Sequence, residues 1–171
     1  MHDMPTAHDV RRAGGWADAW DRCTLTYDER FLRRKVLHTV TESAFLVDLA
    51  HTESLDHGDA FDLADGRLIE VVAAEEPLLE VTGPRLGRIA WHVGNRHTPC
   101  QIEDARLLIQ RDHVMRDMLR RLGAHVHEVT EPFTPEGGAY GHGRTHGHDH
   151  SHTHGPHVHD HGGDDPAHGH D

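Results

Sequence analysis

The sequence has few of the features that mark secreted or membrane proteins. Its 171 residues include two cysteines, Cys23 and Cys100, which are too few for a disulfide framework and favour a reducing compartment. No stretch approaches the roughly 20 apolar residues of a membrane span, and the opening MHDMPTAHDV lacks the apolar core of a secretory signal. Aromatic residues make up 5% of the chain, which is little for a large core. We therefore expect a soluble, cytoplasmic protein with one ordinary domain or two small ones.

Positive charge is also scarce. The chain has 17 Lys and Arg against 29 Asp and Glu, a net charge of −12 with histidine neutral, of which −8 falls in residues 1–140 and −4 in residues 141–171. A surface with this balance repels phosphate backbones, so nucleic acid is not an expected partner and a DNA-reading metal regulator is disfavoured. The local exception is Arg33, Arg34 and Lys35, which form either a solvated strand face or a docking surface for an acidic partner.

The first half of the chain predicts short strands. Residues 1–21 are polar and interrupted by glycine, and we expect them to form a flexible N-terminal extension. Residues 22–76 contain FLRRKVLHTV, AFLVDL, DAFDL and RLIEVV, which are rich in Val, Leu, Ile and Phe, are separated by turn residues and predict an all-β domain. Asp65-Gly66, between the last two segments, is typical of a tight hairpin because glycine tolerates a positive φ.

Residues 77–140 change to a mixed pattern. PLLEVTG predicts a strand, and PRLGRIAWHVGNR then places apolar residues three and four apart on one face of a helix that ends at Gly94-Asn95. Two short strands, PCQIE and RLLIQ, precede a second helix that Asp112 caps and Gly123 ends, and AHVHEVTEPF predicts a final strand. The order β-α-β-β-α-β is the ferredoxin-like arrangement, so the fold class is α+β. One face of such a sheet needs a cover, which a dimer or a neighbouring domain supplies.

Residues 141–171 have no hydrophobic period and predict a disordered tail rich in histidine. Neutral imidazole is the commonest nitrogen ligand for nickel, zinc and copper, and H-x-H spacing on a flexible chain lets two rings reach one ion. The alternative is a solubilising tail or an affinity tag, but tags are usually homopolymeric and these histidines are interleaved with Asp, Ser and Thr. The tail therefore predicts metal binding without indicating which metal. Its candidate ligands are 11 of the chain's 21 histidines, namely His142, His146, His148, His150, His152, His154, His157, His159, His161, His168 and His170.

Histidines in the folded part are the other candidate ligands. His97 follows the expected end of the first helix and His113 opens the second, so both lie where side chains reach the surface. His125 and His127 in the final strand point their rings to one side and would make an accessory pair of ligands. Cys100, three residues after His97, is either a soft ligand or a small buried hydrophobe. From the residues alone, each histidine is either a structural or solvent-exposed side chain or a metal ligand.

WHVGNRHTPCQI and DHVMRDMLRRLGAHVHEVTEPFTPEGGAYG, followed by the histidine-rich tail, resemble the UreE family, the urease accessory proteins that carry nickel to urease. The resemblance covers roughly residues 25–171 and implies an all-β peptide-binding domain followed by a metal-binding domain that forms a homodimer. His97, in GNRH, corresponds to a family histidine that meets its copy at the dimer interface and holds one ion with it. His113 corresponds to a second metal-associated histidine, and Arg111 stands where some members have a further ligand.

This resemblance implies a metallochaperone that delivers Ni(II) to the urease active site, with Zn(II) or Cu(II) as competing occupants. The implied partners are the urease GTPase UreG and the complex of accessory proteins with apo-urease. A chaperone must release its ion, so a few exchangeable nitrogen ligands near a surface suit it. The alternative is a store or buffer for nickel, zinc or copper that uses the tail alone. A metal-dependent hydrolase would need a third fixed ligand and a general base, and no H-E-x-x-H motif is present, so we expect no enzyme activity.

Overall fold

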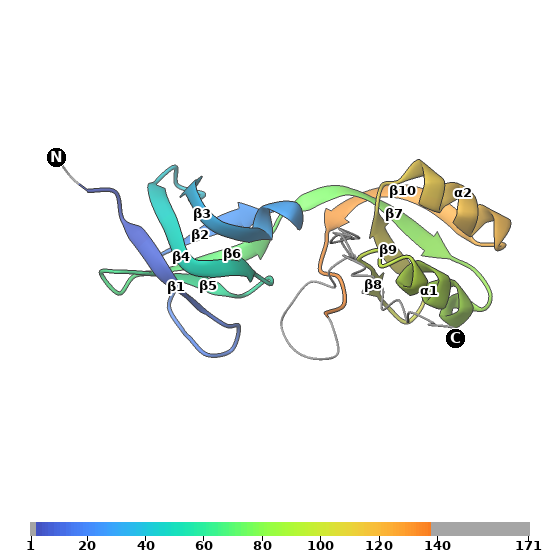
Figure 1. Ribbon diagram of the computed structural model, residues 1–171, viewed down its shortest axis with the longest axis horizontal. Coiled ribbons are helices and arrows are strands. Elements are labelled where there is room, and N and C mark those ends of the chain that lie inside the picture. Colours follow the sequence, from blue (N-terminus) through green and yellow to red (C-terminus); the bar gives the residue numbers. More distant parts are fainter. Residues whose placement is uncertain (1–2, 138–171) are drawn as a thin grey trace, which may run out of the picture.

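The structure is a computed structural model that describes residues 3–137. Two domains follow each other along the chain and along the long axis of the molecule (Figure 1). The expected tail at residues 141–171 lies outside the described residues. The first domain contains β1 (Thr6–Arg11), β2 (Asp21–Leu25), the 3-10 helix η1 (Asp28–Arg30), β3 (Phe31–His38), β4 (Ala44–Ser54), β5 (Ala60–Leu63) and β6 (Leu68–Ala73).

The strands of the first domain form one curled sheet in the order β2-β6-β5-β1-β4-β3. β1 runs parallel to β4 and β2 runs parallel to β6, while the other pairs are antiparallel. The sheet curls so far that the chain just after β3 meets β2, where Val40 N donates to Arg22 O at 2.9 Å. Inward-facing residues of all six strands, among them Phe45, Phe61 and Ile69, form a continuous apolar core. The predicted all-β character of this region is confirmed.

The hairpin predicted at Asp65-Gly66 joins β5 to β6. Gly66 has φ 89°, and Leu63 N donates to Arg67 O at 2.9 Å across the turn. A residue with a Cβ would be strained at this φ, so glycine is required for the tight turn.

The expected flexible extension at residues 1–21 is wrong for its main part. β1 lies inside the sheet between β4 and β5, and Ala7 is completely buried. The following loop is also tied down, because Trp16 Nε1 donates to Gly58 O at 3.0 Å and the Trp20 ring lies 4.0 Å beneath the Arg67 guanidinium. Polar composition misled the prediction, because β1 is stabilised by backbone pairing with strands that follow it by tens of residues, which no local pattern shows.

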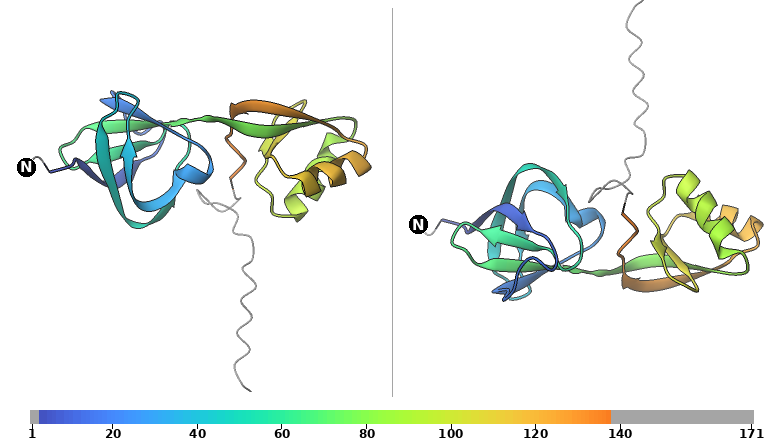
Figure 2. Two further views of the ribbon diagram at one scale, coloured as in Figure 1. Left: turned by 90° about the horizontal axis from the view of Figure 1, so that it is seen from above. Right: turned by 90° about the horizontal axis from the view of Figure 1, so that it is seen from below.

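The second domain contains the elements expected from the sequence, in the expected order. Its strands form an antiparallel sheet in the order β10-β7-β9-β8, and both helices pack on one face of it (Figure 2). Leu79 and Val81 on β7 and Ile89 and Val93 on α1 belong to the core between the sheet and the helices. The elements are β7 (Glu75–Thr82), α1 (Leu86–Asn95), β8 (Gln101–Ile102), β9 (Leu107–Gln110), α2 (His113–Arg121) and β10 (His125–Pro132).

The two helices begin in different ways. Asp112 caps α2 as predicted, because its Oδ1 accepts hydrogen bonds from Val114 N at 2.8 Å and Met115 N at 3.0 Å. α1 begins at Leu86, so Pro84 precedes the first turn that it was expected to occupy. Arg85 takes the N-cap position with φ 61° and makes no side-chain capping bond.

The helix-free face of the second sheet is partly covered from within the chain. Phe133, directly after β10, packs on Leu78 and Leu108, and its ring centroid lies 5.5 Å from that of Tyr27 in the first domain. Arg30, which is 2% exposed, donates to Leu25 O at 3.0 Å, to Leu55 O at 3.2 Å and also to Phe133 O. This guanidinium therefore joins carbonyl oxygens of both domains, and the neighbouring domain supplies the cover expected for this end of the sheet.

Candidate metal centre

His97 lies just past the C-terminal end of α1. Arg96 N donates to Val93 O at 3.2 Å and His97 N donates to Gly94 O at 2.9 Å, so both residues still wind around the helix end. His97 itself has φ 55°, the left-handed conformation, and its side chain is exposed. Helices commonly end with such a residue, usually glycine. Gly94-Asn95, the predicted end, are the last helical residues, and histidine holds the position that glycine usually fills.

A histidine at this position has a structural cost. A residue with a Cβ loses roughly 1–2 kcal/mol in the left-handed region, although histidine enters it more often than most residues. The loop holds the conformation, because Thr98 N donates to Val93 O at 3.4 Å and Thr98 Oγ1 contacts Met115 Sδ of α2 at 3.8 Å. Strain of this kind is a reason to look for a function of the side chain.

The electrostatics of the helix end favour a cation. The last carbonyl groups of a helix carry about half a negative charge, which stabilises a nearby positive charge by typically 0.3–1 kcal/mol. His97 follows these carbonyl groups directly. A metal ion on its imidazole therefore lies in a favourable field, before any further ligand is counted.

Cys100 shares the loop with His97 but is half-buried and packs against the apolar core of the second domain. Burial raises the pKa of the Cys100 thiol to about 11, with the Glu136 carboxylate adding to the shift. The thiolate is the form that binds metals and attacks electrophiles, so at neutral pH this side chain is a neutral thiol. Its packing matches one of the two roles predicted for it from the sequence, that of a small hydrophobe.

His113, the first residue of α2, is exposed in a less favourable setting. It shares a hollow of about 220 Å³ with Arg111 and Arg116 and with the carboxylates of Asp112 and Glu128, and a helix N-terminus carries partial positive charge. Arg111 Nε donates to Leu78 O at 3.2 Å and Nη2 donates to Val129 O at 3.0 Å. Arg111 therefore ties β7 to β10 and offers no lone pair where some relatives were expected to supply a ligand.

His125 and His127 stand on one side of β10, as the sequence predicted. Both are exposed and Val126 between them is buried. Their cross-strand neighbours on β7 are Thr82 and Glu80, and the Glu80 carboxylate is held by Arg106 Nη1 at 2.9 Å. Two imidazoles about 7 Å apart along a strand can share an ion only with further ligands from elsewhere.

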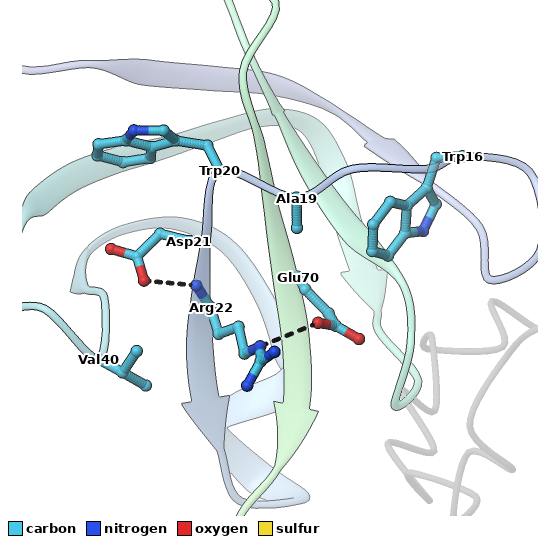
Figure 3. A pocket seen from close by; sticks show the side chains of 7 residues that line it. All are labelled: Trp16, Ala19, Trp20, Asp21, Arg22, Val40 and Glu70. Carbon is cyan, nitrogen blue, oxygen red and sulfur yellow. Dashed lines mark hydrogen bonds and ion pairs between the residues drawn. The ribbon is translucent and has the colours of Figure 1, made fainter.

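The candidate ligands of the folded part thus lie at separate places. Within residues 3–137, no group of three or more His, Cys, Asp and Glu side chains is arranged to hold a metal ion. The tail histidines, from His142 to His170, lie outside the described residues. In the first domain, a hollow of about 380 Å³ is lined by Trp16, Trp20 and the Arg22–Glu70 ion pair (Figure 3), and its lining residues include no histidine or cysteine.

Trp91 is an exposed residue that was not among the candidates predicted from the sequence. It is 63% exposed on the outer face of α1, edge-on to the half-buried His92 ring at a centroid distance of 5.0 Å. A helical projection of the predicted helix would have found it, because it is the one large apolar side chain opposite the buried stripe of α1. Ile102 on β8 and Val114 on α2, both 54% exposed, lie on elements next to the His97 loop. The second domain therefore carries exposed apolar side chains on α1, β8 and α2.

The described residues thus form two domains, and the second carries an exposed imidazole just past the end of a helix. The comparison with known families is specific. The model of the N-terminal domain of the UreE urease accessory protein matches residues 4–74, and that of its C-terminal domain matches residues 76–162. The chain belongs to the UreE family, whose members are metallochaperones in the maturation of urease.

Relatives named urease accessory protein UreE are similar over most of the chain. The protein of Ruegeria pomeroyi is 72% identical over 144 residues, which are 84% of this chain and 97% of the relative. That of Cereibacter sphaeroides is 61% identical over 146 residues, covering 85% and 80% of the two chains. That of Rhodobacter capsulatus is 59% identical over 145 residues, covering 85% and 92%. In the described residues, no helix has the length and apolar character needed to span a bilayer.

Proposed function

We propose that this protein delivers Ni(II) to urease during its maturation, and that two copies of His97 hold the transferable ion at a homodimer interface. The observation that carries the proposal is the exposed His97 imidazole in a strained left-handed conformation at the cation-favouring end of α1. Two imidazoles fill two of the four to six positions that nickel or zinc uses. The open positions allow ligands of a receiving protein to take the ion.

The dimer rests on the second domain, for which we propose the ferredoxin-like arrangement. A pair of imidazoles around one ion is a much smaller contact than the roughly 1,000 Å² of a stable interface. Trp91, Ile102 and Val114 supply exposed apolar surface on α1, β8 and α2 of the second domain. Burying these side chains against a second copy would bring the two His97 residues together.

The histidine-rich tail raises the concentration of ligands beside this site. A flexible linker of roughly 10 residues corresponds to an effective concentration on the order of millimolar. Glu136 N donates to Cys100 O at 2.8 Å, so the chain is still fixed to the His97 loop six residues before His142. The tail histidines would collect ions, Ni(II) and also Zn(II) or Cu(II), and pass them to the interface. His113, with His125 and His127, would be accessory positions for further, weaker ions outside the path of transfer.

The receiving partners would be the urease GTPase UreG and the complex of accessory proteins with apo-urease. Both described cysteines, Cys23 and Cys100, are free, as expected in the cytoplasm. The second candidate function is storage of metal, which the 11 histidines of the tail favour. Storage would need the tail alone and no transfer surface.

Titration calorimetry with Ni(II) and Zn(II) separates these functions. The samples are the full chain, a truncation after Tyr140, His97→Ala, and His113→Ala as the matched control on the other helix. We expect the truncation to keep one tight ion per two chains and His97→Ala to lose it while remaining a dimer. If the truncation binds no ion, the tail is the only site and the storage function stands.

A nickel-transfer assay to UreG then tests delivery directly. His97→Ala should fail to transfer, and His113→Ala should transfer as the unmodified protein does. Equal transfer by His97→Ala and the unmodified protein, with none by the truncation, would place the metal path in the tail and overturn the assignment of His97.

A further inference from the structure

The middle of β3 is exposed on both of its faces. β3 is a terminal strand of the first sheet, paired with β4 on one side. A strand over a core normally alternates buried and exposed residues. In β3, Arg33 to Val36 are four consecutive exposed residues between buried Leu32 and Leu37. The pairing with β4 has a register shift between Leu32 and Arg34, which interrupts the alternation and leaves side chains on both faces of this part of the strand exposed.

Three of these four residues are cations, in a chain with a net charge of −12. Arg34 is 3.9 Å from the Asp48 carboxylate, and Arg33 Nε donates to the backbone Leu49 O at 3.3 Å. Lys35, the chain's single lysine, makes no ion pair or side-chain hydrogen bond with the described residues. The positive charge of this segment is therefore only partly balanced by the protein itself.

The backbone of the same segment faces outward. In an antiparallel pair, alternate residues turn their N–H and C=O groups toward and away from the partner strand. Leu46 on β4 donates its N–H to Pro5 O, at 2.8 Å, away from β3. Its partner across the pair is Val36, so the N–H and C=O groups of Val36 point away from β4. Arg34, two residues earlier, presents its backbone in the same direction.

Apolar side chains flank the cations. Phe31 is 42% exposed and Val36 is 46% exposed, at the two ends of the segment. Edge strands often carry charged residues, because a like-charged or apolar strand of another chain then does not pair with the edge of the sheet. An acidic strand is the exception, because its carboxylates would pair with the cations while its backbone pairs with the edge.

We propose that β3 is a docking edge for an extended acidic segment of another protein, which adds to the sheet as a strand. The outward N–H and C=O groups of Arg34 and Val36 form the backbone pairs, as in other complexes formed by strand addition. Arg34 and Lys35, in the regularly paired part of β3, meet carboxylates on opposite faces, and Arg33 at the register shift adds a third cation. Phe31 and Val36 contact apolar side chains of the added segment, which lie between its carboxylates. This edge is independent of the proposed metal centre, which lies in the other domain.

The first test is binding of a fluorescent ten-residue peptide of alternating Glu and Val to the full chain. Replacing Arg33, Arg34 and Lys35 together by Gln should weaken binding by roughly 3- to 100-fold, the effect of losing three exposed ion pairs. The matched control replaces the exposed Arg88, Arg120 and Arg121 of the second domain by Gln, with the same change in net charge. An equal loss in both variants would mean attraction by overall charge and would overturn the proposal.

The second test examines the backbone. Val36→Pro removes an outward N–H and keeps all three cations, and proline is tolerated at such edge positions. We expect at least about tenfold weaker binding. The same loss is expected for the unmodified protein with a peptide N-methylated at alternate residues, which avoids any folding defect. Full binding of the N-methylated peptide would overturn strand addition.

The third test identifies the occupant. Because Lys35 is the single lysine, a zero-length carbodiimide cross-link from its amine reports which carboxylate lies on β3. Mass spectrometry should find Lys35 joined to a peptide glutamate. A cross-link to an aspartate of residues 149–171 would assign the edge to the chain's own tail. That result, or no cross-link to the peptide, would overturn the proposal.

Discussion

Replacing His97 by glycine separates the backbone conformation of this residue from the chemistry of its imidazole. With φ 55°, any residue with a Cβ is strained here and glycine is not. Relief of the left-handed strain is worth roughly 1–2 kcal/mol, and the greater freedom of glycine in the unfolded chain takes back about 0.4–1 kcal/mol. We therefore expect His97→Gly to be more stable than His97→Ala by about 0.8 kcal/mol.

Urea unfolding of chelator-treated protein measures this difference, at one fixed protein concentration because dimers unfold by mass action. With a slope of about 1–3 kcal/mol per molar urea, the midpoint should rise by roughly 0.3–0.8 M. Both variants should lose the tight ion, because neither has an imidazole. A glycine variant about 1 kcal/mol less stable than the alanine variant would refute the strained conformation. Retention of the tight ion by either variant would refute the metal assignment.

Four further predictions concern the second domain and the metal. Asp112→Ala removes the cap of α2 and should lower the free energy of unfolding by about 1 kcal/mol, with Asp112→Asn close to unchanged; equal stability of all three would contradict the capping bonds. Because the pKa of Cys100 is raised to about 11, iodoacetamide should alkylate this thiol slowly at pH 8 and faster as the pH approaches that value, and rapid reaction at pH 8 would show a thiolate. Arg111→His places a nitrogen donor beside His113 and should add one weak Cu(II) ion per chain, compared with Arg111→Gln as the control. Identical Cu(II) titration curves for the two variants would argue against a metal position at His113. Bound nickel should fall steeply below about pH 6.5, where imidazole gains a proton, and a constant stoichiometry down to about pH 5 would assign the ligands to carboxylates.

The second domain could be predicted from the sequence because its signals are local. The spacing of apolar residues, the Asp112 cap and Gly123 each act within a few residues, and the structure contains the helices that they predict. β1 carried no such signal. Its six residues gain their stability from β4 and β5 on either side, and pairing between distant segments depends on neighbours that a single pass along the chain cannot see.

The candidate site was only partly predictable for a similar reason. A histidine after a helix end can be read from the sequence, but its left-handed conformation depends on where the last helical turn closes, which shifts by one or two residues. The sequence also shows that an arginine stands at position 111. It does not show that this side chain donates hydrogen bonds to two strands. Arg30 gave no signal, because burial of an arginine becomes possible only where carbonyl oxygens of both domains converge on it.

The two helix ends of the second domain give the same side chain opposite surroundings. His97 follows the C-terminal carbonyl groups of α1, where a cation is stabilised, while His113 lies at the N-terminus of α2, whose partial positive charge disfavours a cation. When few ligands hold an ion, the electrostatic field of the helix end is a larger share of the total binding free energy. When many ligands enclose the ion, the share of the field is smaller. If His97 holds the ion as proposed, the favourable field would help a site with open coordination positions to retain it without the enclosing ligands that would prevent release.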